Sequence, residues 1–458
     1  ALAPFLQDPG LPFANVLTEE QVEEAFRAEG VSFGQSEDAV YTPAVTLWAF
    51  LSQMLYTDQH RACAAAVKRA AVFYSTLGRE ISENTGAYCR ARAKLPEAVL
   101  RRLALDAGRR LEDSAPPDWL WCGRHVKLVD GTCITAPDTD ANRKVYPLPP
   151  SQKPGLGFPM LRLVVVISLA TAALCALAFG PYEGEETGES SLLRRVLDSF
   201  QPGEILLADR IYCAYFLLAL AGQRQVDWVV RLHQARHPDF RRGVCQGIRD
   251  LVVTWERPRR PPWMDEATYA TIPERMQLRE IRIQVDEPGF RTDEIVVVTS
   301  LLDAERYPMQ AVAELYHYRW YVELDIRAIK QFTAMDHLRC KNPAMIHREL
   351  WVHWLAYNLI RKSIAQAAMV HGRAPRRLSY TGAQQTLAAS WDRLTTAGGD
   401  QRLALAQTQL RMIAQHVVPD RPGRVEPRAI KSVPSHFPRL TEPRPQARRK
   451  LYRHWALR

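Results

Sequence analysis

The stretch "RHVKLVDGT" at residues 124–132 is a short apolar run that ends in an acidic residue and a polar turn. Runs of four to eight residues rich in Val and Leu are typical of buried strands, so we expect a strand that ends at Asp130. The next apolar stretch, "LVVVISLATAALCALAFG" at residues 163–180, is uncharged and nearly long enough to cross a membrane. A membrane protein is therefore one alternative class. The β-branched first half and the small, polar middle favour two buried strands joined by a tight turn instead.

Four further elements follow in a regular order. We expect a helix in "ESSLLRRVLDSF", a strand in "GEILLADRIY" that ends at Asp209, a helix in "CAYFLLALAGQ" and a strand in "VDWVVRL". The order is strand, hairpin, helix, strand, helix, strand. It predicts an α/β layer with a mixed sheet.

The flanking regions differ from this layer in composition. The first 118 residues have apolar residues at helical spacing, with a Thr-Pro start at residues 42–43 and a break at Pro96. Residues 234–292 are rich in Arg and Pro, with pieces typical of strands, and a long helix is expected over 345–370. We therefore expect five regions: a helical N-terminal region (1–118), the first part of the core (119–233), a β-rich insertion (234–292), the second part of the core (293–417) and a basic C-terminal tail (418–458).

The charge of the chain favours a polyanionic partner. The formal net charge is +10 and the pI is about 9.2, which indicates nucleic acid or an anionic surface. Beyond residue 418, eleven Lys or Arg stand against three acids. Such a tail is expected to be extended or disordered until it meets a polyanion. The eight cysteines include no C-x-x-C pair, and the chain does not begin with a signal peptide, so a reducing compartment is expected.

A second basic group lies in the N-terminal region. Arg90, Arg92, Lys94, Arg101 and Arg102 follow one another along two helical stretches. They are either a phosphate-binding face or the solvated side of amphipathic helices. Residue types alone do not separate the two interpretations.

The stretch "LYHYRWYVELDIRAIK" at residues 315–330 is expected to be one helix. At about 100° per residue, Arg319, Glu323 and Lys330 fall within about 60° of Tyr316 and form one polar row. Beside it lies an apolar row that would dock the helix on a core: Leu315, Val322, Ile326 and Ile329. The alternative is an ordinary i,i+4 ion pair on a solvated face.

Asp130 and Asp209 each follow an apolar strand, where α/β sheets bind ligands. Either could simply cap a turn. Two of them, together with Glu323 on a docked helix, instead predict a metal site, because carboxylate oxygens are the ligands that Mg²⁺ prefers. Two such ions about 3.5 to 4 Å apart hold the attacking and leaving oxygens of a phosphodiester. Arg319 and Lys330 fit phosphate oxygens.

These motifs together resemble those of the insertion-sequence-four family of bacterial DDE transposases. The family signature, Tyr, two residues, Arg, three, Glu, six, Lys, matches Tyr316, Arg319, Glu323 and Lys330. The family's "DGT" and "DR-x-Y" match residues 130–132 and 209–212. Further blocks extend the resemblance from about residue 45 to 440. Any one motif is weak, but the ordered set is specific.

The resemblance implies an α/β fold with an RNase H-like core, a β-rich insertion before the Glu helix and an all-α N-terminal domain. It implies Asp130, Asp209 and Glu323 as catalytic and metal-binding residues for two Mg²⁺ ions, with Mn²⁺ as a substitute. It implies double-stranded DNA as partner, a homodimer that bridges two transposon ends, cut-and-paste transposition, and a place in the bacterial cytoplasm near the nucleoid. DNA or phosphate contacts would come from Tyr316, Arg319, Lys330, Arg210 and Tyr212, and from Arg90 and Arg92.

Two rival functions keep the same fold. One is a stand-alone RNase H-like nuclease without strand transfer, and the other is a domesticated transposase that binds DNA without cutting it. The three acidic residues argue against a pure binding protein.

Other residues are candidates for lesser roles. Related transposases that form DNA hairpins hold a flipped base on an aromatic residue near the last core strand; "TDEIVVVTSLLDAE" has none, and Trp255, Trp263 and Tyr269 are the alternatives in the insertion. Three further acids either support the site or, more simply, cap turns and stay solvated: Asp138, Asp140 and Glu189.

Overall fold

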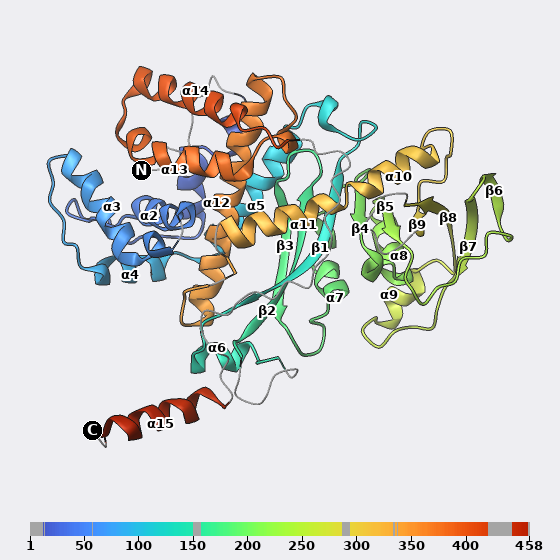
Figure 1. Cartoon of the computed structure of the whole chain (residues 1–458), viewed down its shortest axis with the longest axis horizontal. Helices are drawn as coiled ribbons and strands as arrows, with labels where there is room; N and C mark the ends of the chain where they lie inside the picture. The colour runs from blue at the N-terminus through green and yellow to red at the C-terminus, as the bar shows by residue number, and fades with distance from the viewer. Residues whose placement is uncertain are drawn as a thin grey trace.

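A mixed α/β architecture is built around one long sheet in the computed structural model, which describes residues 12, 14–56, 58–149, 157–285, 294–332, 335–336, 338–419 and 442–456. In this described part, nine strands follow the order β3-β2-β1-β4-β5-β9-β8-β7-β6 (Figure 1). The strands are β1 Val126–Thr135, β2 Met160–Ser168, β3 Leu174–Pro181, β4 Ile205–Ala208, β5 Asp227–Arg231, β6 Val244–Gly247, β7 Asp250–Glu256, β8 Arg275–Gln284 and β9 Glu294–Thr299.

The sheet is parallel only at its centre. Strands β1, β4 and β5 are parallel, whereas β2 and β3 form an antiparallel hairpin on one side. On the other side β9 pairs antiparallel with β5, and β8, β7 and β6 continue from it. The predicted order of strand, hairpin, helix, strand, helix, strand is confirmed, including the two buried strands in residues 163–180. Among the described residues, no helix is long and apolar enough to cross a membrane.

Helices cover both faces of the sheet. They are α1 Glu19–Ala28, α2 Pro43–Leu55, α3 Cys63–Thr76, α4 Thr85–Lys94, α5 Glu97–Asp113, α6 Asp140–Val145, α7 Glu189–Arg194, α8 Tyr215–Gln223, α9 Glu266–Thr271, α10 Met309–His317, α11 Trp320–Arg327, α12 Pro343–Val370, α13 Tyr380–Thr396, α14 Gly399–Gln415 and α15 Arg444–Ala456. Successive strand residues point to opposite faces. Leu128 accordingly joins the core under α5 and α12, and its neighbour Val129 joins the core under α7 and α8.

The N-terminal helices pack against the C-terminal helices rather than standing apart. Helix α12 contacts α2 and α5, and α13 contacts α2 and α3. The indole rings of Trp48 and Trp391 stack with centroids 5.9 Å apart inside this contact. Figure 1 shows α2, α3 and α4 beside α12 and α13, with the sheet at their side. The predicted helices over the N-terminal region and over 345–370, including the Thr42–Pro43 start, are confirmed within the described residues.

The segment expected as a β-rich insertion carries β6, β7 and β8, which extend the core sheet through β9; its residues 286–292 lie outside the described part. Two expectations need correction. The strand expected to end at Asp130 continues to Thr135, because β2 pairs with it from Lys127 to Thr135. The tail is not extended throughout, because residues 444–456 form α15.

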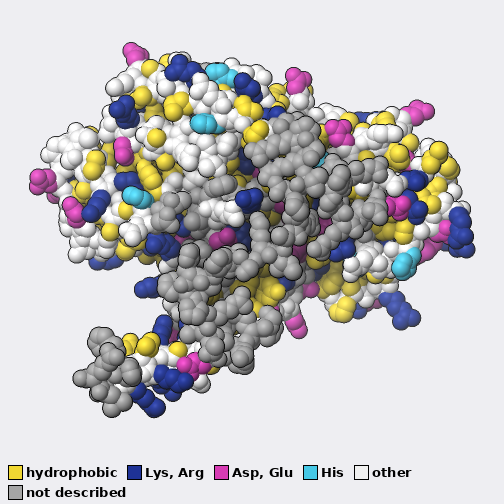
Figure 2. All heavy atoms as spheres, in the orientation of Figure 1, with side chains coloured by type: hydrophobic (Ala, Val, Ile, Leu, Met, Phe, Trp, Pro, Cys, Tyr) yellow, Lys and Arg dark blue, Asp and Glu magenta, His cyan; other side chains and the backbone are white. Residues whose placement is uncertain are grey.

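Helix α15 is the most basic exposed element in the described part of the tail. Figure 2 shows its Lys and Arg side chains gathered at the lower left, while basic and acidic side chains are interspersed on the rest of this face. Its first residue, Arg444, contacts Asp138 at 3.2 Å and lies over the ring of Phe158. Tail residues 420–441 and 457–458 lie outside the described residues.

Candidate active site

The parallel pairing of β1 and β4 brings two of the predicted acidic residues together. Val129 is paired with Ala208, the last residue of β4. Asp130 and Asp209 are therefore the next residues in register, at the carboxyl end of neighbouring parallel strands. The edge of β1 beyond Val129 no longer has β4 beside it. This is the kind of sheet edge where α/β proteins bind ligands.

The stretch expected as one helix is instead two helices and a π-helical segment. Helix α10 ends at His317, α11 begins at Trp320, and residues Ala328–Phe332 are π-helical. The amides of Arg319 and Val322 bond to carbonyls three residues earlier, which tightens the helix locally. The predicted apolar row is confirmed as buried, from Leu315 to Ile329.

The polar row faces the two aspartates despite this break. Arg319 donates to the Glu323 carboxylate at 2.7 Å, and its other amino group lies 3.9 Å from Asp130 Oδ2. Glu323 is thereby linked to Asp130 through one guanidinium. The pKa of Arg319 is raised: burial alone would lower it, but Tyr316, Glu323 and Asp209 outweigh that effect. Arg319 thus contacts Glu323, lies near Asp130 and is influenced by the charge of Asp209.

Asp130 lies in an environment that disfavours its charge. Burial raises its pKa to about 6, although the Gly131 amide and Arg319 act in the opposite direction. Glu189 and Glu323 raise it further. An arginine 3.9 Å away thus does not compensate for the burial and the neighbouring carboxylates. A bound cation would remove this penalty.

The remaining members of the row contact protein rather than solvent. Tyr316 is 8% exposed, so its ring is covered. Burial is the largest cause of its raised pKa; the charge of Arg319 lowers this pKa and that of Asp209 raises it. Lys330 Nζ donates to Cys133 O at 2.9 Å and forms an ion pair with Asp336 at 3.1 Å. Lys330 therefore ties the π-helical segment to β1.

The residues of the second motif and the N-terminal arginines lie in different environments. Arg210 is exposed, whereas Tyr212 is fully buried. Arg90 is exposed. Arg92 turns inward, with its guanidinium 4.9 Å from the centre of the Phe50 ring.

The other basic residues of the N-terminal group do not share one free face. Arg102 forms ion pairs with Glu24 and Asp106, whereas Lys94 and Arg101 are exposed. Of the aromatic residues weighed for base binding, Trp255 is buried in the sheet, and Trp263 is 37% exposed with Arg194 stacked on it.

Asp325 was not predicted to be important, and Glu189 was predicted either to support the site or, more simply, to cap a turn and stay solvated. In the structure Glu189 lies against Gly131, beside Asp130. It is the first residue of α7, the helix that follows the β2–β3 hairpin. Asp325 belongs to neither row of the expected helix, and its burial depends on residues far along the chain.

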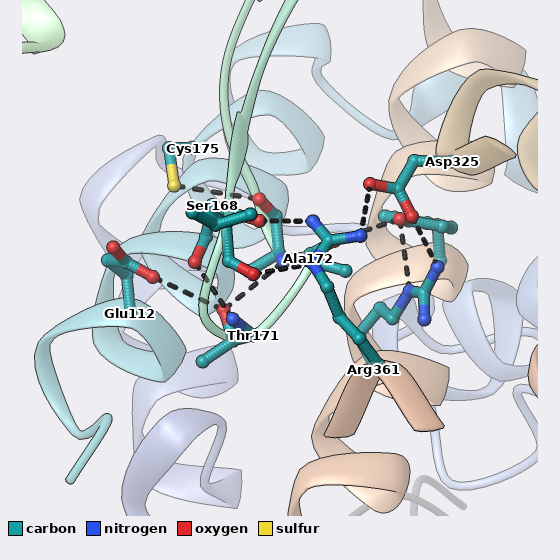
Figure 3. A network of polar contacts seen from close by, with 11 residues as sticks. Glu112, Ser168, Thr171, Ala172, Cys175, Asp325 and Arg361 are labelled. Atoms are coloured by element: carbon teal, nitrogen blue, oxygen red, sulfur yellow. Dashed lines mark hydrogen bonds and ion pairs between the residues drawn. The ribbon is translucent and has the colours of Figure 1, made fainter. Parts of the chain in front are cut away.

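Asp325 fixes α11 to the rest of the molecule. It is 2% exposed and accepts hydrogen bonds from Arg361 at 2.7 Å and Arg376 at 3.0 Å. Arg376 also donates to the carbonyl of Ser168, the last residue of β2. Figure 3 shows Asp325 facing Arg361 on one side of this network, with Ser168 and Thr171 on the other. The network therefore sets the position of Glu323, two residues before Asp325.

The donor set of the site suits a hard divalent cation, because it consists of carboxylate oxygens. Among the residues that the structure describes, no three His, Cys, Asp or Glu side chains are grouped closely enough to hold a metal ion as they stand. Arg319 occupies the space between the carboxylates of Asp130 and Glu323. Loading would require Arg319 to shift toward another anion, such as a phosphate.

Residues 121–359, more than half of the chain, match the model of the transposase DDE domain family. The chain belongs to this family. The chain is also similar to "Transposase InsG for insertion sequence element IS4" from Escherichia coli (strain K12), with 26% identity over 361 residues that cover 77% of each chain.

A solved structure is also similar in part. The chain aligns with a piggyBac transposase, whose structure is a synaptic complex with hairpin DNA, at 10% identity and a TM-score of 0.41. The alignment covers 93% of this chain and 86% of the other.

Proposed function

We propose that the chain catalyses cut-and-paste DNA transposition, with Asp130, Asp209 and Glu323 as the residues that hold divalent metal ions. The observation that carries the proposal is that Arg319 bonds to Glu323 and lies 3.9 Å from Asp130, while Asp209 is next in register at the end of the neighbouring parallel strand. Enzymes with a DDE domain generally use divalent metal ions, and the oxygen donors favour Mg²⁺. When bound, such ions polarise a phosphodiester and lower the pKa of water.

The chemistry consists of two displacements at phosphorus. In the first, a water oxygen bonds to the phosphorus at the transposon end, the bond to the 3′-oxygen breaks, and that oxygen leaves as a 3′-hydroxyl. In the second, this hydroxyl bonds to a phosphorus of target DNA, whose own 3′-oxygen leaves. Both are in-line reactions of the same kind, so one set of carboxylates serves both.

The protein residues orient the DNA backbone in this scheme. Arg319, freed from the carboxylates when cations replace it, is positioned to bind a phosphate oxygen through its planar guanidinium. Lys330 has its ammonium group on β1, two to three residues beyond Asp130, and can exchange Asp336 for a phosphate. Arg210 is exposed next to Asp209 and supplies a further cation.

The strand arrangement supports an RNase H-like core. An antiparallel hairpin lies beside three parallel strands in the order β3-β2-β1-β4-β5, with Asp130 on β1 and Asp209 directly after β4. We divide the chain as expected from sequence: helical DNA-binding region 1–118, core 119–233 and 293–417, insertion 234–292, tail 418–458. Two such chains would bridge two double-stranded transposon ends.

The test is a cleavage assay with full-length protein. A labelled duplex that carries the terminal repeat of the encoding insertion sequence is incubated with Mg²⁺, with Mn²⁺ or with EDTA. We expect cutting only with metal, and loss of cutting by at least about a hundredfold in Glu323→Gln, as for loss of a group needed in the transition state. Glu305→Gln, at an exposed site, is the matched control.

The same assay separates the rival functions. Joining of the cut end to an added supercoiled plasmid supports a transposase, whereas cutting without joining indicates a stand-alone nuclease. Binding in a gel shift without any cutting by the parent indicates a DNA-binding protein. Equal cutting by the parent and Glu323→Gln would refute the assignment of the three carboxylates.

A further inference from the structure

The glycine of the "DGT" motif leaves room for a fourth carboxylate. A Cβ atom placed on Gly131 would lie 2.2 Å from the carboxyl carbon of Glu189 and 2.5 and 2.6 Å from its two oxygens. Gly131 is an ordinary strand residue paired with Val164, and its φ is not positive. The backbone conformation there is open to other residues. The glycine is therefore explained by the space that Glu189 fills.

The tyrosine of the "DR-x-Y" motif contacts the same carboxylate. Tyr212 is fully buried, and its hydroxyl donates to Glu189 Oε2 at 3.3 Å. Next to Glu189, the hydroxyl of Ser190 donates to the carbonyl of Ile211 at 3.1 Å. These bonds tie the start of α7 to the turn that follows Asp209. Both motifs thus contribute a residue whose contact is with Glu189.

Glu189 reaches the site from the face opposite to Glu323. Gly131 and Asp130 point to opposite faces of β1 because they are successive strand residues. Since β4 ends at Ala208, the edge of β1 beside Asp130 is open, and groups from both faces can meet there. Burial is the largest cause of the raised pKa of Tyr212, and Glu189, Asp130 and Asp209 raise it further. The buried Tyr212 hydroxyl thus bonds to Glu189 and is influenced by the charges of Asp130 and Asp209.

A purely structural role for Glu189 does not account for its contacts with Gly131 and Tyr212. An acidic residue in the first turn of a helix stabilises it by about 0.3–1 kcal/mol, but that role needs neither a glycine opposite nor a buried tyrosine. A solvated glutamate needs neither of them. The convergence of two motif residues on one carboxylate is accounted for if that carboxylate has to be held in a fixed place.

We propose that Glu189 is a fourth acidic residue of the metal site, contributing a carboxylate oxygen to the divalent cations held by Asp130 and Asp209. The proposal rests on the proposed function, since it extends the same site. Gly131 and Tyr212 are positioning residues: one leaves the space and the other fixes the orientation.

The first test measures metal binding without DNA cleavage. Mn²⁺ is titrated into the full chain by calorimetry, for the parent and for Glu189→Gln, Asp130→Asn and Glu185→Gln, the last being an exposed residue four positions away. We expect Glu189→Gln to weaken Mn²⁺ binding by about tenfold or more, comparable to other losses around metal sites. Glu185→Gln is expected to bind as the parent does.

Two results would count against the proposal in different ways. If Asp130→Asn loses Mn²⁺ while Glu189→Gln binds it as tightly as the parent, Glu189 is not a ligand and the proposed function stands. If the parent and Asp130→Asn bind Mn²⁺ equally, the carboxylates are not a metal site, and the proposed function falls together with this inference.

The second test checks the placement of Glu189 by stability alone. Gly131→Ala is made in the parent and in the Glu189→Ala background, and the thermal unfolding temperature is measured for all four proteins. Because the three atoms nearest to the new methyl group all belong to the glutamate carboxylate, we expect most of the loss to disappear in the Glu189→Ala background. An equal loss in both backgrounds would show that Glu189 does not lie over Gly131.

Discussion

Replacing Asp325 by asparagine should uncouple Glu323 from the sheet without touching the candidate site. Asp325 is buried and accepts hydrogen bonds from two arginines, Arg361 and Arg376. Hydrogen bonds to charged groups contribute about 1.5–3 kcal/mol each, and removing one partner of a buried ion pair costs about 3–5 kcal/mol. Asparagine keeps the size and one acceptor oxygen. We therefore expect a loss of about 3 kcal/mol in the free energy of unfolding.

The assay combines urea unfolding with end cleavage. Asp392→Asn, at an exposed position on α13, is the matched control and should change neither. In the Asp325 variant we expect cleavage by the folded protein to fall at least tenfold while DNA binding in a gel shift is kept, because α11 is no longer held in one position. Unchanged stability would refute the view that the two arginines depend on Asp325. Unchanged cleavage with lowered stability would refute its role in placing Glu323.

Two further predictions concern stability. Burial alone would raise the pKa of Glu112, but Lys127 and His125 lower it to about 2. Its contribution to stability is therefore present above about pH 4.5 and is lost as the pH falls toward 2. Urea midpoints between pH 2.5 and 6 should rise with pH more steeply in the parent than in Glu112→Gln, and parallel curves would contradict this. Trp48→Ala should cost about 3–5 kcal/mol because the ring is buried against Trp391; a loss below about 1 kcal/mol in urea unfolding would show that the helices do not depend on this contact.

Local patterns predicted the central strands and the two aspartates because buried parallel strands are continuous apolar runs with a sharp polar end. The same reasoning misplaced the end of β1. "DGT" looks like a turn, but Asp130, Gly131 and Thr132 remain in the strand because β2 pairs with their backbone. The polar residues of "DGT" belong to the candidate site and do not mark the end of the strand.

Long-range packing accounts for what the patterns missed. The break near Arg319 follows from how α10 and α11 pack on different strands, β5 and β1, which helical periodicity does not contain. Asp325 is buried by arginines 36 and 51 residues later. The carboxylate of Glu189 in α7 fills the space left by Gly131 in β1. Each depends on a contact between segments that are distant in the sequence.

The packing of α12 on the N-terminal helices has a consequence for the order in which a newly made chain matures. Helices α2 and α5 bury their apolar faces partly against α12, which is completed only at Val370. At ribosomal rates of about 5–20 residues per second, the N-terminal helices must wait on the order of ten seconds or more for this partner. During that interval Asp130 and Asp209 have emerged without Glu323. A chain still on the ribosome therefore exposes unfinished apolar surface and lacks one of its three proposed catalytic acids.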